Sequence, residues 1–169
     1  GEVVVQGWRE GTGRTILDRM RELEGLVGGF LVTFVEHEGR MSGTAEMEQI
    51  AALVEAAGDA KLTIAGGVTT AAELAELDAL GVDAQVGMAL YSGQLHLADA
   101  ICARMRSDRP DGLWSTVVVD EHGVALGLCY SNLESVRAAV DRVSGVYHSR
   151  RRGLWHKGAS SGATQELLA

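Results

Sequence analysis

Proline, cysteine and aromatic residues are scarce in this sequence of 169 residues, which has one proline, two cysteines and 5% aromatic residues. The cysteines, Cys102 and Cys129, form no CxxC or Cys/His pattern. This usage favours a reducing, cytoplasmic location, where a thiol is more often a small buried side chain than a metal ligand. No apolar run is long enough to cross a bilayer and no signal peptide opens the chain, so we expect no membrane partner.

Positive charge is also scarce, because 15 Lys and Arg residues stand against 23 Asp and Glu, for a net charge of -8. This balance argues against nonspecific binding to nucleic acid. Residues 137–157 are the exception, with a single acid, Asp141, among the basic residues Arg137, Arg142, Arg150, Arg151, Arg152 and Lys157. Such a cluster suits a small anionic substrate, and a solvated charged face is the alternative.

The chain is expected to be a fragment with two domains. It begins at Gly1 and runs directly into the strand-like Val3–Val5, as if cut inside a strand. The one proline, Pro110, lies in a polar stretch, and proline breaks helices, so we predict a linker over 107–112. The predicted domains are therefore 1–106 and 113–169.

Strand-like apolar runs alternate with helical patterns in the first domain. Strands are predicted at Val3–Val5, Phe30–Val35, Lys61–Ala65 and Val82–Val86, and helices at Thr15–Leu26, Ala45–Ala57, Ala71–Leu80 and Leu95–Met105. Apolar strands separated by amphipathic helices indicate βαβ units and a parallel sheet buried on both faces. The fold class predicted for this domain is α/β.

The second domain has α+β character. Two strands, Leu113–Val119 and Ala125–Tyr130, flank a hairpin turn signal at 120–123. A helix follows over Asn132–Val143, capped by Ser131 or Asn132, and an extended pattern resumes at Gly145–Ser149.

Glycines follow two consecutive strands of the first domain. Gly66 and Gly67 come after the strand at 61–65, and Gly87 comes after the strand at 82–86. Glycine lets the backbone approach a ligand, and amides at a helix N-terminus favour an anion. Consecutive strands that end in this way are typical of a barrel phosphate site, and plain turns are the alternative.

An ordered set of motifs over residues 1–105 resembles the C-terminal half of ProFAR isomerase, a (βα)8 (TIM) barrel enzyme of histidine biosynthesis. The matching positions are Gly7-Trp8, Thr33, Gly39, Ser42-Gly43, Ala65–Val68 and Val86–Tyr91. The resemblance implies the C-terminal part of a TIM barrel, with Thr33 either a remnant of the isomerase site or a buried strand residue. It also implies an Amadori rearrangement, although the acid and base of that family match positions before Gly1 and Phe34 replaces an acidic residue. An active barrel in the parent protein and a degenerate barrel that serves as a docking scaffold are the alternatives, and we favour the second.

The segment Tyr147–Gln165 is rich in arginine, serine and glycine. Arginine forks match phosphate oxygens, and hydroxyls and loop amides donate further hydrogen bonds. Trp155 either stacks on a purine or fills the core. His148 and His156 have no nearby Cys or acidic partner, so a zinc site is disfavoured and solvent-facing positions are expected.

The same segment resembles the motif of phosphoribosyl-AMP cyclohydrolase, Ser-Arg-x-Arg followed by Leu-Trp-x-Lys-Gly-x-x-Ser-Gly and Gln. The resemblance covers about residues 111–168 and is closest in wording to fungal-type multifunctional histidine-biosynthesis proteins; it departs at Ala163, where many bacterial members carry His. It implies an incomplete α+β cyclohydrolase domain. It also implies that these residues bind the phosphoribosyl nucleotide: Ser149, Arg150, Arg152, Trp155, Lys157, Gly158, Ser161 and Gly162.

The cyclohydrolase resemblance further implies a reaction, in which zinc-activated water opens the purine ring of phosphoribosyl-AMP and magnesium assists. The family's ligands, an Asp cluster and three Cys, lie mostly beyond the Ser-Gly motif. We therefore expect no metal ligands in this chain and no turnover by the isolated fragment, with the parent protein as the hydrolase. The family is dimeric, so a homodimer is expected.

Overall fold

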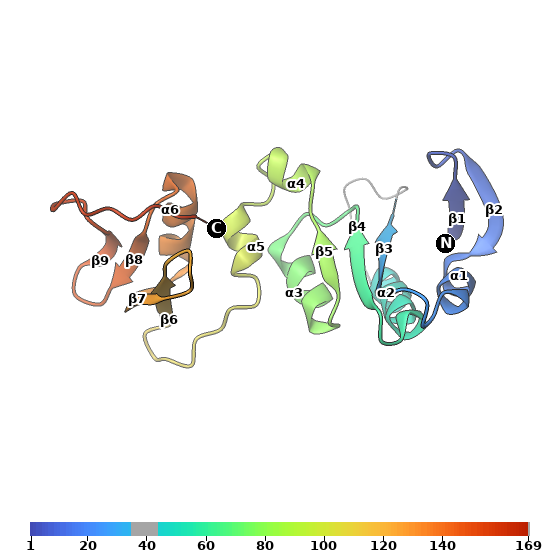
Figure 1. Ribbon diagram of the computed structural model, residues 1–169, viewed down its shortest axis with the longest axis horizontal. Helices are drawn as coiled ribbons and strands as arrows, with labels where there is room; N and C mark the ends of the chain where they lie inside the picture. The colour runs from blue at the N-terminus through green and yellow to red at the C-terminus, as the bar shows by residue number, and fades with distance from the viewer. Residues whose placement is uncertain (35–43, 169) are drawn as a thin grey trace. The chain divides into compact units, whose positions relative to one another are not determined.

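The structure, a computed structural model, describes residues 1–34 and 44–168 (Figure 1). The chain forms two compact units, Gly1–Gln94 and Leu95–Ala169. Helix α5 (Leu97–Ile101) belongs to the second unit, which therefore starts before the predicted linker. The domain boundaries at 106 and 113 stay a prediction, and the isomerase-like positions Gly39 and Ser42-Gly43 lie outside the described residues.

The first unit opens with a hairpin of two strands, β1 (Glu2–Val5) and β2 (Glu10–Thr15), which pair antiparallel. The chain reverses through the left-handed residues Gln6, Gly7 and Trp8. The prediction that Val3–Val5 is a strand is confirmed, but its assignment to the parallel sheet is wrong. Strand β2 is exposed along its whole length and carries no apolar alternation, so the sequence did not predict the strand that pairs with β1.

A three-stranded parallel sheet with the order β3-β4-β5 follows. Its strands are β3 (Gly29–Thr33), β4 (Lys61–Ala65) and β5 (Asp83–Gln85), in full parallel register. The helices between and around them are α1 (Ile16–Glu22), α2 (Thr44–Ala57), α3 (Ala71–Ala79) and α4 (Met88–Tyr91). The α/β prediction is confirmed, and the strands within the described residues form an open sheet rather than a closed barrel.

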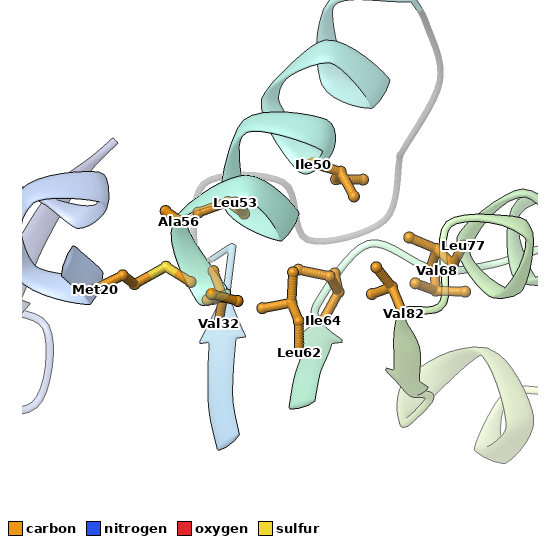
Figure 2. Close-up of a cluster of buried hydrophobic side chains, with 11 residues drawn as sticks. Met20, Val32, Ile50, Leu53, Ala56, Leu62, Ile64, Val68, Leu77 and Val82 are labelled. Carbon is orange, nitrogen blue, oxygen red and sulfur yellow. The ribbon is translucent and has the colours of Figure 1, made fainter. Parts of the chain in front are cut away.

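The core of the first unit lies between this sheet and its helices. Figure 2 shows Leu53 and Ala56 of α2 above Val32 of β3, with Leu62 and Ile64 of β4 beside them. Leu77 of α3 and Val82 extend the same cluster beyond β4. Burial of each such aliphatic side chain stabilises the fold by about 1.5–3 kcal/mol, so the predicted apolar runs are the main source of stability here.

Local capping explains where the helices begin. Thr15 accepts a hydrogen bond from the Asp18 amide at the start of α1. Thr70 and Glu73 form a capping box at the start of α3, in which each side chain bonds the other residue's backbone amide.

The second unit consists of two antiparallel hairpins and two helices. Strands β6 (Trp114–Val119) and β7 (Ala125–Ser131) form the first hairpin, and β8 (Val146–Ser149) and β9 (Gly153–His156) form the second. Helix α6 (Leu133–Arg142) connects them and begins at the capping residue Asn132. The predicted hairpin and helix are confirmed, whereas the predicted helix at 95–105 is limited to the five residues of α5.

Candidate functional site

A cavity of about 550 Å³ opens in the second unit, next to the hairpin β8–β9. Three stretches of chain line it: the end of β7, the end of β8 with its following turn, and Trp155 of β9. The lining residues are Leu128, Cys129, Tyr130, His148, Ser149, Arg150, Arg151, Arg152 and Trp155. Four of the predicted substrate-binding residues, Ser149, Arg150, Arg152 and Trp155, therefore lie together.

Two of the cavity's arginines lie over aromatic rings. The guanidinium carbon of Arg150 lies 4.6 Å from the ring centroid of Tyr130, and that of Arg152 lies 5.0 Å from the ring centroid of Trp155. Among the residues that the structure describes, Arg150, Arg151 and Arg152 have no acidic ion-pair partner. An aromatic ring attracts the cation without neutralising its charge, so these guanidinium groups keep a positive charge and N–H donors for an anion.

Ser149 shapes the turn that carries these arginines. Its hydroxyl oxygen accepts hydrogen bonds from the amides of Arg151 at 3.4 Å and Arg152 at 3.3 Å. The Arg152 amide also donates to the Ser149 carbonyl at 3.2 Å, and Gly153 has a left-handed φ of 72°. This turn, which joins the two strands of the hairpin, carries the three consecutive arginines.

Both histidines of this region have partners inside the unit. His148 Nδ1 lies 3.1 Å from the side-chain Nδ2 of Asn132, and His156 Nε2 lies 3.0 Å from the Ser144 hydroxyl. Both side chains are half-buried, so the expectation of solvent-facing positions is wrong. The reason is that these strand positions face polar groups at the two ends of α6, Asn132 and Ser144.

Potential metal ligands do not gather in the described part of the chain, which has no group of three or more His, Cys, Asp and Glu side chains. Burial raises the pKa of the Cys129 thiol, which favours the protonated form over the thiolate that binds metals. The described residues therefore do not fit a zinc centre.

The other predicted binding residues of this unit lie in the loop after β9 and outside the cavity's lining. The Lys157 amide donates to the Gly145 carbonyl at 3.0 Å, and the Gly162 amide donates to the Gly158 carbonyl at 2.8 Å. Gly158 has a φ of 79°, and a Cβ there would clash with the Ala163 carbonyl group. Ser161 accepts a 3.4 Å hydrogen bond from the Ala163 amide. The structure gives these residues roles in closing the loop, and their binding role stays a prediction.

Gly66 and Gly67 follow the C-terminal end of β4, and Gly87 follows that of β5. These glycines lie at the same edge of the sheet because the two strands are parallel neighbours. Gly66 and Gly67 both have a φ of 84°, and Gly87 caps α4. A Cβ at Gly66 would lie 2.7 Å from the Phe34 carbonyl oxygen, which gives that glycine a packing role. Thr33 ends the neighbouring strand β3 and is exposed, so the alternative of a buried threonine is wrong.

Two residues near the cavity were missed from the sequence, Tyr130 and Arg109. The guanidinium carbon of Arg109 lies 4.8 Å from the Tyr130 ring centroid. The residues of this contact are about twenty positions apart along the chain, so no local spacing signals it. A tyrosine at the end of a strand that leads into a capped helix was the one available hint.

Comparison with known proteins gives a family match for each of the two parts of the chain. The sequence model described as "Histidine biosynthesis protein" matches residues 1–96, which is more than half of the chain. The chain belongs to the histidine biosynthesis protein family. The model of phosphoribosyl-AMP cyclohydrolase matches residues 127–169 of this family member, so both resemblances drawn from the sequence are confirmed.

Curated relatives of this family member are histidine-biosynthesis proteins. A histidine biosynthesis trifunctional protein of Neurospora crassa is 57% identical over 77 residues, which cover 46% of this chain and 9% of the relative. A histidine biosynthesis bifunctional protein of Schizosaccharomyces pombe is 57% identical over 75 residues, 44% of this chain and 18% of the relative.

A phosphoribosyl imidazole-4-carboxamide isomerase of Methanocorpusculum labreanum is 37% identical over 102 residues, 60% of this chain and 42% of the relative. The chain thus spans less than half the length of each of these relatives. No solved structure matches it significantly. No helix within the described ranges is long and apolar enough to cross a bilayer.

Proposed function

We propose that this chain is part of a histidine-biosynthesis enzyme that opens the purine ring of phosphoribosyl-AMP by hydrolysis, and that its cavity binds a phosphate of that substrate. One observation carries the proposal. Every residue that lines the cavity, from Leu128 to Trp155, lies inside the segment that matches phosphoribosyl-AMP cyclohydrolase.

The charge and size of the cavity support a phosphorylated ligand. Arg150, Arg151 and Arg152 bring three guanidinium groups to one turn, and guanidinium forks bind phosphate oxygens in pairs. A volume of about 550 Å³ lies within the range of small-molecule sites. In this arrangement Arg150 and Arg152 bind the phosphate, Ser149 fixes their turn, and Trp155 supplies an aromatic wall.

Zinc and magnesium are proposed for the complete enzyme, as the cyclohydrolase resemblance implies. Zinc would supply the activated water that attacks the ring. Because the described residues do not cluster as metal ligands, this chain is assigned substrate binding and no step of water activation.

Calorimetric titration of the 169-residue chain with phosphoribosyl-AMP tests the proposal. The wild-type chain is expected to bind, and the double variant Arg150→Met, Arg152→Met is expected to lose at least about tenfold in affinity, since each charge-assisted contact contributes about 1.5–3 kcal/mol. The matched control is Arg142→Met, which removes one positive charge from exposed α6 outside the cavity. Absence of binding by the wild type, or an equal loss in the control, would overturn the phosphate site.

A second candidate site is the sheet edge of the first unit, where Thr33, Gly66, Gly67 and Gly87 follow the ends of neighbouring parallel strands. We propose it as an isomerase-like phosphate site, retained from an active barrel or kept in a docking scaffold. Inorganic phosphate should shift the amide resonances of Gly67 and Gly87 in the NMR spectrum. Unchanged resonances at millimolar phosphate would contradict the phosphate site and leave the docking scaffold as the proposed role of the first unit.

A homodimer and a cytoplasmic location complete the proposal. Val117, Leu126 and Leu128 are exposed on the hairpin β6–β7, and apolar surface of this kind is typical of an interface. Sedimentation at several concentrations should show a dimer. The free thiols of Cys102 and Cys129 suit a reducing compartment.

A further inference from the structure

The ring of Tyr130 is shared by two arginines, one inside the segment that matches phosphoribosyl-AMP cyclohydrolase and one before it. Arg150 lies over it at 4.6 Å and belongs to the turn of the cavity. Arg109 lies over the same ring at 4.8 Å and comes from the segment before β6. Arg109 is the one member of this three-residue stack outside residues 127–169, which match the cyclohydrolase model.

A short turn fixes Arg109 in place. The Gly112 amide donates to the Arg109 carbonyl at 3.0 Å, which closes a turn with Pro110 in its second position. The Arg109 amide donates to the Ser107 hydroxyl at 3.1 Å, and that hydroxyl donates to the Leu113 carbonyl at 2.7 Å. Leu113 is buried, so the turn is anchored to the body of the unit.

Asp111 holds the Arg109 guanidinium and neutralises its charge. Arg109 donates two hydrogen bonds to the Asp111 carboxylate, at 3.0 and 2.9 Å. These hydrogen bonds hold the pKa of the Asp111 carboxyl below its ordinary value, so both partners are charged at neutral pH. Two bare cations on one ring would repel each other, whereas an Arg109–Asp111 pair is neutral as a whole.

We infer that Arg109 is a positioning residue for the cavity: paired with Asp111, it holds the Tyr130 ring as a platform on which Arg150 is presented to a phosphate. This inference rests on the proposed function for the nature of the ligand. The geometry of the stack is independent of it. Arg150 is an exposed, flexible side chain with no acidic partner among the described residues, so its aromatic platform is what limits its motion.

The first measurement needs no ligand. In the wild-type chain, NMR relaxation of the Arg150 Nε–Hε group should show restricted motion. Arg109→Met and Tyr130→Leu are expected to release it, while Tyr130→Phe, which keeps the ring, should retain it. Arg142→Met is the control, since Arg142 lies outside the cavity lining. An Arg150 side chain that moves equally in the wild type and in Arg109→Met would overturn the inference.

The second measurement is affinity, with AMP and adenosine as probes. Arg109→Met is expected to weaken AMP binding about threefold to tenfold and to leave adenosine unchanged, because the lost order affects the phosphate contact. Arg109→Lys should show the same loss, since it retains the charge but not the planar stack. In an Arg150→Met background the Arg109 substitution should have no further effect.

These outcomes separate the two proposals. A wild-type chain that fails to bind AMP while its Arg150 is ordered contradicts the phosphate site and leaves the positioning role supported. A chain that binds AMP, with the effects of Arg109→Met and Arg150→Met simply additive, contradicts the positioning role and leaves the phosphate site supported. Melting temperatures of Arg109→Met and Arg109→Lys equal to that of the wild-type chain would show that unfolding does not explain the losses.

Discussion

Arg137 donates two hydrogen bonds of 2.8 Å to Asp99, one to each carboxylate oxygen. The pair joins α6 to α5 within the second unit, beside a second contact of 2.8 Å between His96 Nε2 and Asp141. The hydrogen bonds from Arg137, followed by its charge, hold the pKa of Asp99 below its ordinary value, against the opposing effect of burial.

Acid is therefore expected to weaken the second unit through Asp99. A carboxyl group whose pKa is lower in the folded state stabilises the fold above its unfolded pKa of about 3.9, and this contribution is lost as the pH falls through the folded value. Urea unfolding from neutral pH down to acid should show the loss. Asp99→Asn and Arg137→Met should both be less stable at neutral pH and show a flatter pH dependence; an unchanged slope in Asp99→Asn would contradict this account.

Gly158→Ala should destabilise the second unit severely. The added methyl group would clash with the backbone carbonyl of Ala163, and the backbone at Gly158 has a φ of 79°. We expect a loss of at least about 3 kcal/mol in the free energy of unfolding, since the neighbouring backbone must move to make room for the methyl group. The matched control is Gly162→Ala, with a φ of 77° and nothing within 4 Å, which should cost about 1–2 kcal/mol. Equal losses in chemical denaturation would contradict the packing role of Gly158.

Ile64→Ala should destabilise the first unit. Ile64 of β4 is 0% exposed and lies in the cluster of Figure 2, so its truncation leaves a cavity that costs about 2–5 kcal/mol. Leu31→Ala on the neighbouring strand β3 is the control, because Leu31 is 64% exposed and its loss should cost less than about 1 kcal/mol. Circular dichroism in increasing urea measures both. A similar cost at the two positions would mean that the face assigned to the core is wrong.

Chelation should leave nucleotide binding by this chain intact. The cavity derives its positive charge from arginines, and the described residues contain no cluster of metal ligands. The affinity for AMP with EDTA present should stay within about twofold of that without it, because guanidinium–phosphate contacts need no metal. Loss of binding on chelation, with recovery on adding Zn²⁺, would show a metal in the site.

Periodic segments of this fold could be predicted from the sequence, and non-periodic ones could not. Strand β4 has the predicted bounds, Lys61–Ala65, because an apolar run is bounded there by a charged residue and a glycine pair. Strand β2, with the sequence EGTGRT, is held by pairing with β1 rather than by burial, so no apolar pattern marks it. Helix α5 is shorter than the amphipathic pattern that predicts it, because it ends at Ile101 with Cys102 as its C-cap, before the end of that pattern at Met105.

The candidate site also has a part that the sequence predicts and a part that it does not. Ser149, Arg150, Arg152 and Trp155 lie on one hairpin, so a local motif was enough to group them. Tyr130 and Arg109 join them only through the packing of separate elements, which a single sequence does not reveal. The loop glycines lie in the same motif, yet the structure separates them from the cavity because the chain turns away after β9.

The pairing of β6 with β7 has a practical consequence for anyone who divides this gene. The cyclohydrolase match begins at residue 127, inside β7, whereas the strand that bonds to β7 spans Trp114–Val119. A polypeptide that started at the match would leave the amide and carbonyl groups of β7 without their partners and would also lack Arg109. Expression boundaries are better placed before Leu95, where the second compact unit begins.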